Sequence, residues 1–152
     1  MKLENISLRL AMLAGLSIAG ASAASAQGVE FFAVLSGGYE VSPDGKAAAG
    51  DRDGYGTASF TFVGSDRFCY AVIVNAIDRP VAMHIHQAPA GRNGPVVIPL
   101  TPPSRGTGGT SSGCVSGVSA SLLRSIRSTP TGFYLNVHTA AFPDGAVRGQ
   151  LF

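Results

Sequence analysis

Residues 57–74 of this 152-residue chain, TASFTFVGSDRFCYAVIV, decide its fold class. In residues 57–63, alanine and phenylalanine alternate with serine and threonine, which is the period-two pattern of a strand with one covered face. Residues 64–66, Gly-Ser-Asp, are typical of a tight turn between strands. Residues 68–74 are apolar on both faces, which predicts a central strand covered on both sides. The stretch therefore predicts two antiparallel strands joined by a hairpin.

The rest of the chain continues as short strands separated by glycine, proline and aspartate turns. Residues 119–127 are the one helix candidate, capped by Ser119 or Ser121 and ended before Pro130. Residues 101–113 are rich in Gly, Ser, Thr and Pro, which predicts a mobile surface loop. We expect an all-β fold, an antiparallel β-sandwich or barrel with one short helix. The expected strands are residues 30–35, 57–63, 68–74, 81–86, 95–100, 133–139 and 146–152.

The first 26 residues have the pattern of an export signal. Lys2 and Arg9 precede an apolar stretch over residues 10–21, and residues 24–26, Ala-Ser-Ala, form a small-residue cleavage site. This pattern predicts a signal peptide over residues 1–26, with an uncleaved anchor as the alternative. We expect one mature domain over residues 27–152, located in the periplasm or secreted, with no stable membrane span after cleavage.

The charge pattern argues against nucleic acid as a partner. The chain has a net charge of +2, and its Lys and Arg residues are scattered singly. Nucleic-acid binding requires basic residues that cluster on one face.

Cys69 and Cys114 are the only cysteines. In an oxidising compartment, two cysteines most simply form one disulfide bond. Two unpaired buried thiols are the alternative. A catalytic or metal-binding cysteine is less favoured, because neither cysteine belongs to a C-x-x-C pair.

The three histidines, His84, His86 and His138, are the candidate metal ligands. His84 and His86 are two residues apart in an expected strand, so both lie on one face, roughly 7 Å apart along the backbone. His138 lies on the polar face of residues 133–138. Three imidazoles leave an open coordination position for water or a small ligand, as in catalytic metal sites. The alternative is that they are ordinary solvated strand histidines.

Polar neighbours of this set come from the last two strands. Tyr134 and Asn136 share the face of His138, and Arg148 and Gln150 lie on the polar face of residues 146–152. If these strands are adjacent, one patch contains all of them, and Arg148 attracts a small anion. Imidazole binds copper, zinc and iron, with raw affinity favouring copper. A carboxylate from Asp144 or Glu40 would favour iron.

One further motif, Gly-Thr-Ser-Ser-Gly at residues 109–113, fits G-x-S-x-G. A nucleophile elbow requires a strand-to-helix turn in a larger α/β sheet, and this motif lies in a low-complexity segment. We interpret the match as chance.

Several stretches resemble the motifs of the CHRD (chordin) domain family. Residues 82–100, AMHIHQAPAGRNGPVVIPL, resemble its central motif, and residues 132–151, GFYLNVHTAAFPDGAVRGQL, resemble its closing motif. Residues 35–43, LSGGYEVSP, are similar to its opening motif, and residues 112–115, SGCV, to its middle one. The resemblance implies an extracytoplasmic, immunoglobulin-like β-sandwich of the bacterial secreted type. The resemblance also implies that His84, His86, His138 and Arg148 occupy positions of the family's motifs. The chain departs from the family at residues 87–89, QAP, where the family often has glycine.

A looser similarity concerns the chemistry. An H-x-H pair, a distant histidine and a late arginine on a β-sandwich are similar to the copper side of copper/zinc superoxide dismutases, although a fourth histidine and a zinc subsite are missing. The first hypothesis is therefore a mononuclear copper or iron site, with zinc less favoured, that removes superoxide. Arg148 would attract the anion, and Tyr134, Asn136 and Gln150 would surround the ligands. The alternative is a non-catalytic protein-binding module with an exposed apolar patch that includes Phe142 and Pro143.

Overall fold

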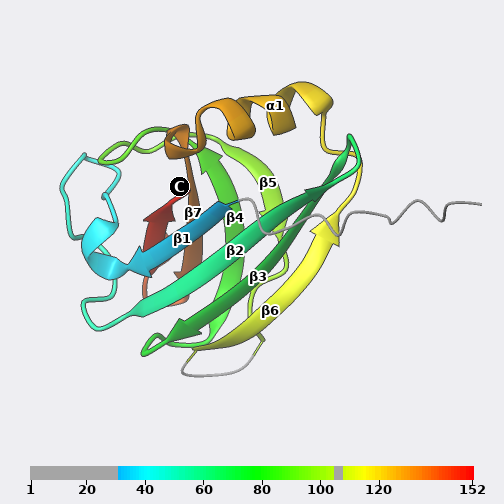
Figure 1. Ribbon diagram of the computed structural model, residues 1–152. Helices are drawn as coiled ribbons and strands as arrows, with labels where there is room; N and C mark the ends of the chain where they lie inside the picture. The colour runs from blue at the N-terminus through cyan, green and yellow to red at the C-terminus, as the bar shows by residue number, and fades with distance from the viewer. Residues whose placement is uncertain (1–30, 105–107) are drawn as a thin grey trace, which may run out of the picture.

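The computed structural model describes residues 31–104 and 108–152 and contains eight strands and one α-helix in these ranges. The predicted signal peptide lies outside the described residues and stays a prediction. None of the described helices is long and apolar enough to cross a membrane. Figure 1 shows the elements in chain order: β1 (Phe31–Ser36), η1 (Gly37–Tyr39), β2 (Tyr55–Val63), β3 (Arg67–Asn75), β4 (Pro80–Gln87), β5 (Val96–Leu100), β6 (Gly108–Val115), α1 (Ala120–Ser128), η2 (Pro130–Gly132), β7 (Phe133–Thr139) and β8 (Val147–Gln150).

The eight strands form one antiparallel sheet in the order β5-β4-β7-β8-β1-β2-β3-β6. The sheet curls so far that its two edges meet. The amide of Thr101, just after β5, donates to Tyr70 Oη at 3.1 Å, and Ser111 Oγ on β6 donates to the Thr101 carbonyl at 2.6 Å. The prediction of an all-β antiparallel fold with one short helix is confirmed, and the curled sheet approaches a closed barrel (Figure 1).

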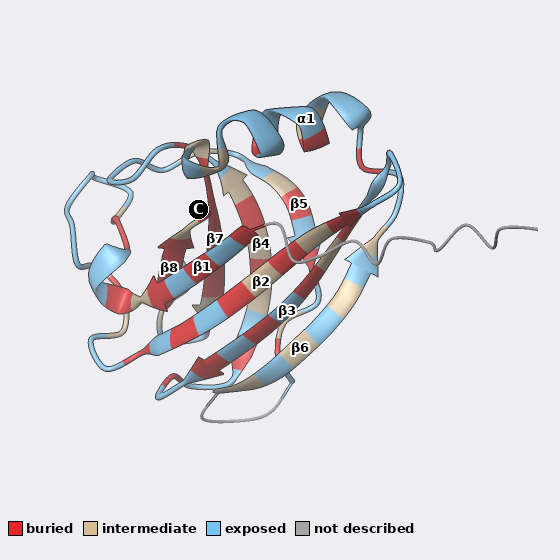
Figure 2. Cartoon of the chain, viewed as in Figure 1, coloured by how far each residue is buried: buried red, intermediate tan, exposed pale blue. Residues whose placement is uncertain are grey.

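The core fills the inside of this curled sheet because the inward-facing residues of its strands other than β6 are mainly apolar. Buried and exposed positions alternate along β2 and β3, as Figure 2 shows. The helix α1 lies across one end, where Leu123 and Ile126 close the core (Figure 1). Its N-cap is Ser119, whose side chain accepts from the Leu122 amide at 3.2 Å. The largest core side chains include Phe60, Phe62, Phe68, Met83, Ile85, Ile98 and Leu135.

The prediction that residues 68–74 are covered on both faces is wrong. Strand β3 lies between β2 and β6, but only one of its faces is buried. Ala71 and Ile73 point outward, and Ile73 is 49% exposed. A curled sheet has one inner face, and within residues 31–104 and 108–152 no second layer covers β3 from outside. Apolar residues on both faces therefore do not establish that both faces are covered.

The prediction of a loop over residues 101–113 is also wrong in its second half. Residues 108–115 form β6, which pairs with β3 from Phe68↔Val115 to Asn75↔Gly108. The pairing is made by backbone groups, which explains why a segment of Gly, Ser and Thr forms a strand without apolar alternation. The G-x-S-x-G match lies on this strand and has no strand-to-helix turn, so it is no nucleophile elbow.

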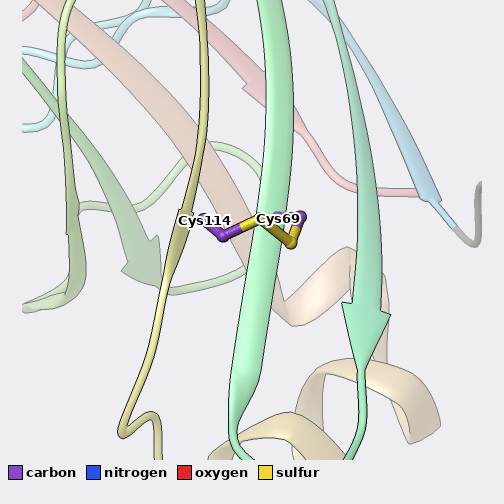
Figure 3. The surroundings of a disulfide bond; sticks show 2 residues. All are labelled: Cys69 and Cys114. Atoms are coloured by element: carbon purple, nitrogen blue, oxygen red, sulfur yellow. A yellow bond between two sulfur atoms is a disulfide. The ribbon is translucent and has the colours of Figure 1, made fainter.

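The predicted disulfide between Cys69 and Cys114 is confirmed (Figure 3). The two cysteines are directly opposite each other in the β3–β6 ladder. The bond therefore connects the edge strand β6 to the body of the sheet.

Candidate metal centre

The three histidines come together because β4 and β7 are hydrogen-bonded neighbours. His84 and His86 lie on β4, and His138 lies on β7, where it pairs with Ala82 of β4. One ring nitrogen from each histidine lies within 4.8 Å of the others. The side chains are partly buried rather than freely solvated. The sequence left open whether these strands are adjacent; β4 and β7 are neighbours, and their three histidines lie together.

Two backbone carbonyl groups set the tautomers of His86 and His138. Nδ1 of His86 donates to the Gly94 carbonyl at 2.9 Å, and Nδ1 of His138 donates to the Pro143 carbonyl at 2.9 Å. A carbonyl oxygen can only accept, so each Nδ1 carries the proton and each Nε2 keeps its lone pair. Such hydrogen bonds are the usual outer partners of metal-binding histidines.

The remaining ring nitrogens fit a metal ion. Nδ1 of His84 lies 3.3 Å from Nε2 of His138. Two nitrogens bound to one tetrahedral metal at about 2.0–2.1 Å lie about 3.3–3.4 Å apart. A direct hydrogen bond between the rings of His84 and His138 also accounts for this distance, but it gives no partner to the third ring, that of His86. Nε2 of His86 is buried and has no hydrogen-bond partner among the described residues, an arrangement that costs about 1–3 kcal/mol in a folded protein.

The environment keeps all three imidazoles neutral at pH 7, and metal binding requires neutral imidazoles. Burial is the largest cause that lowers the pKa of His84, of His86 and of His138 below the usual 6.5. The other histidines lower the pKa of His84 further, and His138 and Arg148 do the same for His86. The bonds to Gly94 and Pro143 oppose the shift only in part.

Neither carboxylate that could have favoured iron joins the cluster. The group of candidate ligands in the described residues consists of the three histidines alone. Asp144 is exposed, whereas Glu40 is 1% exposed and accepts from the Val41 amide at 2.9 Å through Oε1. Burial raises the pKa of Glu40, and its Oε2 has no described hydrogen-bond partner.

Arg148 lies beside the histidines but is directed away from solvent. It is 1% exposed and sits on β8, next to β7, where it pairs with Asn136. Its Nη1 donates to Asn93 Oδ1 at 3.1 Å, and its Nη2 donates to the carbonyls of Pro89 at 3.3 Å and Arg92 at 2.7 Å. The sequence placed Arg148 on an open polar patch, but residues 88–94 fold over this face, and the guanidinium binds the loop that covers it.

The three polar neighbours expected around the ligands also hold loops. Tyr134 Oη accepts from the Gly94 amide at 3.3 Å, and Asn136 Nδ2 donates to the Asp144 carbonyl at 3.3 Å. Gln150 Nε2 donates to the carbonyls of Ala88 at 2.7 Å and Thr131 at 2.8 Å. Among the hydrogen bonds of the described residues, the histidine partners outside the cluster are the carbonyls of Gly94 and Pro143. The sequence gives no signal for these two partners, because every residue type has a backbone carbonyl.

The comparison with protein families gives one match. The family model of the CHRD domain matches residues 31–151, which include every described strand and all three histidines. Comparison with curated proteins and with solved structures finds no match. Because the family match extends over most of the chain, this protein belongs to the CHRD domain family.

Proposed function

We propose that this protein is an exported CHRD-domain protein that binds one copper ion through His84, His86 and His138. The observation that carries the proposal is the buried Nε2 of His86, which has no described hydrogen-bond partner and lies in a cluster with the other two rings. A metal ion would satisfy all three ring nitrogens at once. The disulfide between Cys69 and Cys114 supports export, because disulfides persist mainly in oxidising compartments.

Copper is favoured over iron and zinc by the donor set. Three imidazoles without a carboxylate differ from the two-histidine, one-carboxylate sites of non-haem iron. Between copper and zinc, the general affinity order favours copper. Three protein ligands also leave a coordination position for a small molecule.

The activity we propose for this site is the dismutation of superoxide. Bound copper would supply one-electron redox chemistry. The imidazoles hold the ion, and their lowered pKa values keep the nitrogens unprotonated at neutral pH. The charge of Arg148 is close enough to lower the pKa of His86, so it also makes the local potential more positive and favours an anion.

Elemental analysis tests the metal proposal. The mature protein is purified from its export compartment without a chelator or a histidine tag, beside a His86→Ala variant. Gln87→Ala, which changes the exposed neighbour on the same strand, is the matched control. We expect about one equivalent of copper in the wild type and in the control, and none in His86→Ala. Absence of metal after reconstitution, or retention of copper in a His86→Ala/His138→Ala double variant, contradicts the proposal.

A superoxide-removal assay of the copper-loaded protein tests the activity separately. We expect removal that is lost in His86→Ala and kept in Gln87→Ala. If the loaded wild type does not accelerate removal, the dismutase proposal fails and the metal proposal stands.

The alternative of a non-catalytic protein-binding module has less support. The patch expected for it includes Phe142, but this side chain is partly buried and packs against the core. Pro143 is exposed, and its carbonyl accepts from His138. The turn at residues 142–145 is therefore better interpreted as part of the histidine site.

A further inference from the structure

We propose that Arg148 is a positioning residue of the metal centre, which fixes the tautomer of His86 through the loop at residues 88–94 and its ring plane through Tyr134. The inference rests on the proposed metal site. It assigns Arg148 a geometric role that its charge alone would not supply.

The first step is the contact between this loop and His86. The Gly94 carbonyl accepts from His86 Nδ1, and the Gly94 amide donates to Tyr134 Oη. Both peptide groups that meet at Gly94 are therefore engaged with the site. A side chain at this position is excluded, because a Cβ on Gly94 would overlap the carbonyl oxygen of Gln87. Any shift of the loop would move the carbonyl that selects the proton position of His86.

The second step is the clamp that holds the loop. The Arg148 guanidinium donates to three acceptors in residues 89–93, two carbonyls and the Asn93 side chain. Asn93 Nδ2 then donates to the carbonyls of Val41 at 2.9 Å and Ser42 at 3.1 Å. A planar guanidinium can reach several acceptors with one fixed geometry, which a lysine ammonium cannot reproduce. The clamp therefore depends on the fork of Arg148 as well as on its charge.

The third step is a stack that joins Arg148 to the same histidine. The Arg148 Cζ lies 3.4 Å from the centroid of the Tyr134 ring. The ring of His86 is stacked on Tyr134 with centroids 4.8 Å apart and planes 9° apart. Because β7 lies between β4 and β8, Tyr134 separates His86 from Arg148. The stack holds the imidazole plane, and the clamp holds its hydrogen-bond acceptor.

The test compares Arg148→Lys, which keeps the positive charge, with the wild-type protein. In the metal-free state, the ¹⁵N shifts of the imidazole rings report the tautomer of His86. We expect one Nδ1–H tautomer in the wild type and a mixture in Arg148→Lys. In the copper-bound state, we expect copper binding to weaken by about 10–100-fold, with a changed electron paramagnetic resonance spectrum of Cu(II).

Two controls separate positioning from general destabilisation. Val72→Ala removes core volume in β3, away from the site, and Arg124→Lys changes an exposed arginine on α1. We expect both to keep the wild-type tautomer and copper spectrum. If Arg148→Lys does not fold, Asn93→Ala removes one clamp acceptor at an exposed position together with the two bonds that Asn93 Nδ2 donates. This variant should change the tautomer and the copper affinity in the same direction.

The outcomes distinguish this inference from the proposed function. If the wild type binds no copper, the proposed metal site fails, whereas the tautomer measurement still tests the clamp. If the wild type binds copper and Arg148→Lys keeps its affinity, spectrum and tautomer, the positioning role is overturned and Arg148 acts by charge alone. The positioning role is also overturned if Arg148→Lys keeps the wild-type tautomer and loses no more copper affinity than Val72→Ala, with the two variants equally stable.

Discussion

The imidazole of His86 is the side chain on which the proposed metal centre depends most closely. Its Nδ1 is bonded to the Gly94 carbonyl, one ring face lies on Tyr134, and its Nε2 is buried without a described partner. Proton position, ring orientation and the free lone pair are thus set by three different neighbours. A chance pair of solvated strand histidines would not have all three constraints.

Acid should weaken copper binding in a window set by the histidine pKa values. Burial lowers these values below 6.5, so the folded protein takes up protons at lower pH than the unfolded chain. Copper affinity should therefore be nearly constant above about pH 6.5 and fall as the pH drops through the lowered pKa values. The stability of the metal-free protein should fall at higher pH than the copper affinity, between 6.5 and the lowered pKa values, and should level off below them, where the folded and unfolded states are both protonated. Copper titrations and thermal melts between pH 8 and 4.5 test this, and a steep loss of affinity between pH 8 and 7 would contradict it.

Replacing the buried carboxylate of Glu40 should stabilise the protein at neutral pH. Desolvation raises its pKa above the usual 4.5, so the carboxyl group opposes folding increasingly as the pH rises above 4.5, and fully once the pH exceeds the raised value. Glu40→Gln keeps the acceptor for the Val41 amide and removes the charge. The variant should be more stable than wild type at pH 7 and nearly equal at pH 4, where Glu40 is protonated.

Denaturation with urea at both pH values measures the effect of Glu40→Gln. Asp44→Asn is the matched control, because Lys46 lowers the pKa of the exposed Asp44. Removing that charge should give no gain at pH 7. A Glu40→Gln variant that is less stable than wild type at pH 7 would show that the carboxylate charge favours folding.

At the scale of single elements, the N-cap of α1 makes a small and separable contribution to stability. Ser119 Oγ accepts from the Leu122 amide at 3.2 Å. Ser119→Ala should lower the free energy of unfolding by about 1 kcal/mol, because one amide at the helix start loses its partner. Chemical denaturation measures the change, with the exposed Ser116→Ala as control. Equal stabilities of the two variants would argue against the cap.

Strand β6 should depend on the disulfide more than any other strand does. It is an edge strand, and among the strands that the structure describes it pairs with β3 alone. A Cys69→Ala/Cys114→Ala variant should lose about 4 kcal/mol if loop closure across 45 residues is the main effect. Amide hydrogen exchange should accelerate more in β6 than in β2. Unchanged exchange in β6 would mean that backbone pairing alone holds this edge.

For the whole molecule, copper binding should raise the thermal midpoint. A ligand that binds only the folded state adds about 2.7 kcal/mol of stability when its free concentration is about 100 times its Kd. For a domain of this size, that corresponds to a rise in the thermal midpoint on the order of 10 °C. A chelator should reverse the shift, and His84→Ala should abolish it. A thermal midpoint that copper changes equally in wild type and His84→Ala would indicate binding elsewhere.

Much of the fold could be predicted from local patterns. The apolar alternation of β2, β4 and β7 and the capped helix at Ser119 are properties of consecutive residues, so their positions agree with the structure within a few residues. Strand β6 could not be found in this way, because its Gly, Ser and Thr residues carry no alternation and its pairing is made by the backbone of β3. The prediction that both faces of β3 are covered was wrong for a related reason: apolar composition does not show whether a second layer packs on the sheet.

By itself, the sequence determined the all-β class, the placement of His84 and His86 on one strand face, and the cysteine pair. Each follows from the periodicity of side chains along the chain or from the chemistry of a residue type, which does not depend on its place in the fold. Only the tertiary structure decided that His138 reaches the same site, that Arg148 is buried under residues 88–94, and that Gly94 and Pro143 orient the ligands. These features depend on the order of strands paired over long sequence separations and on which loop covers which face, and neither is encoded in any single stretch of residues.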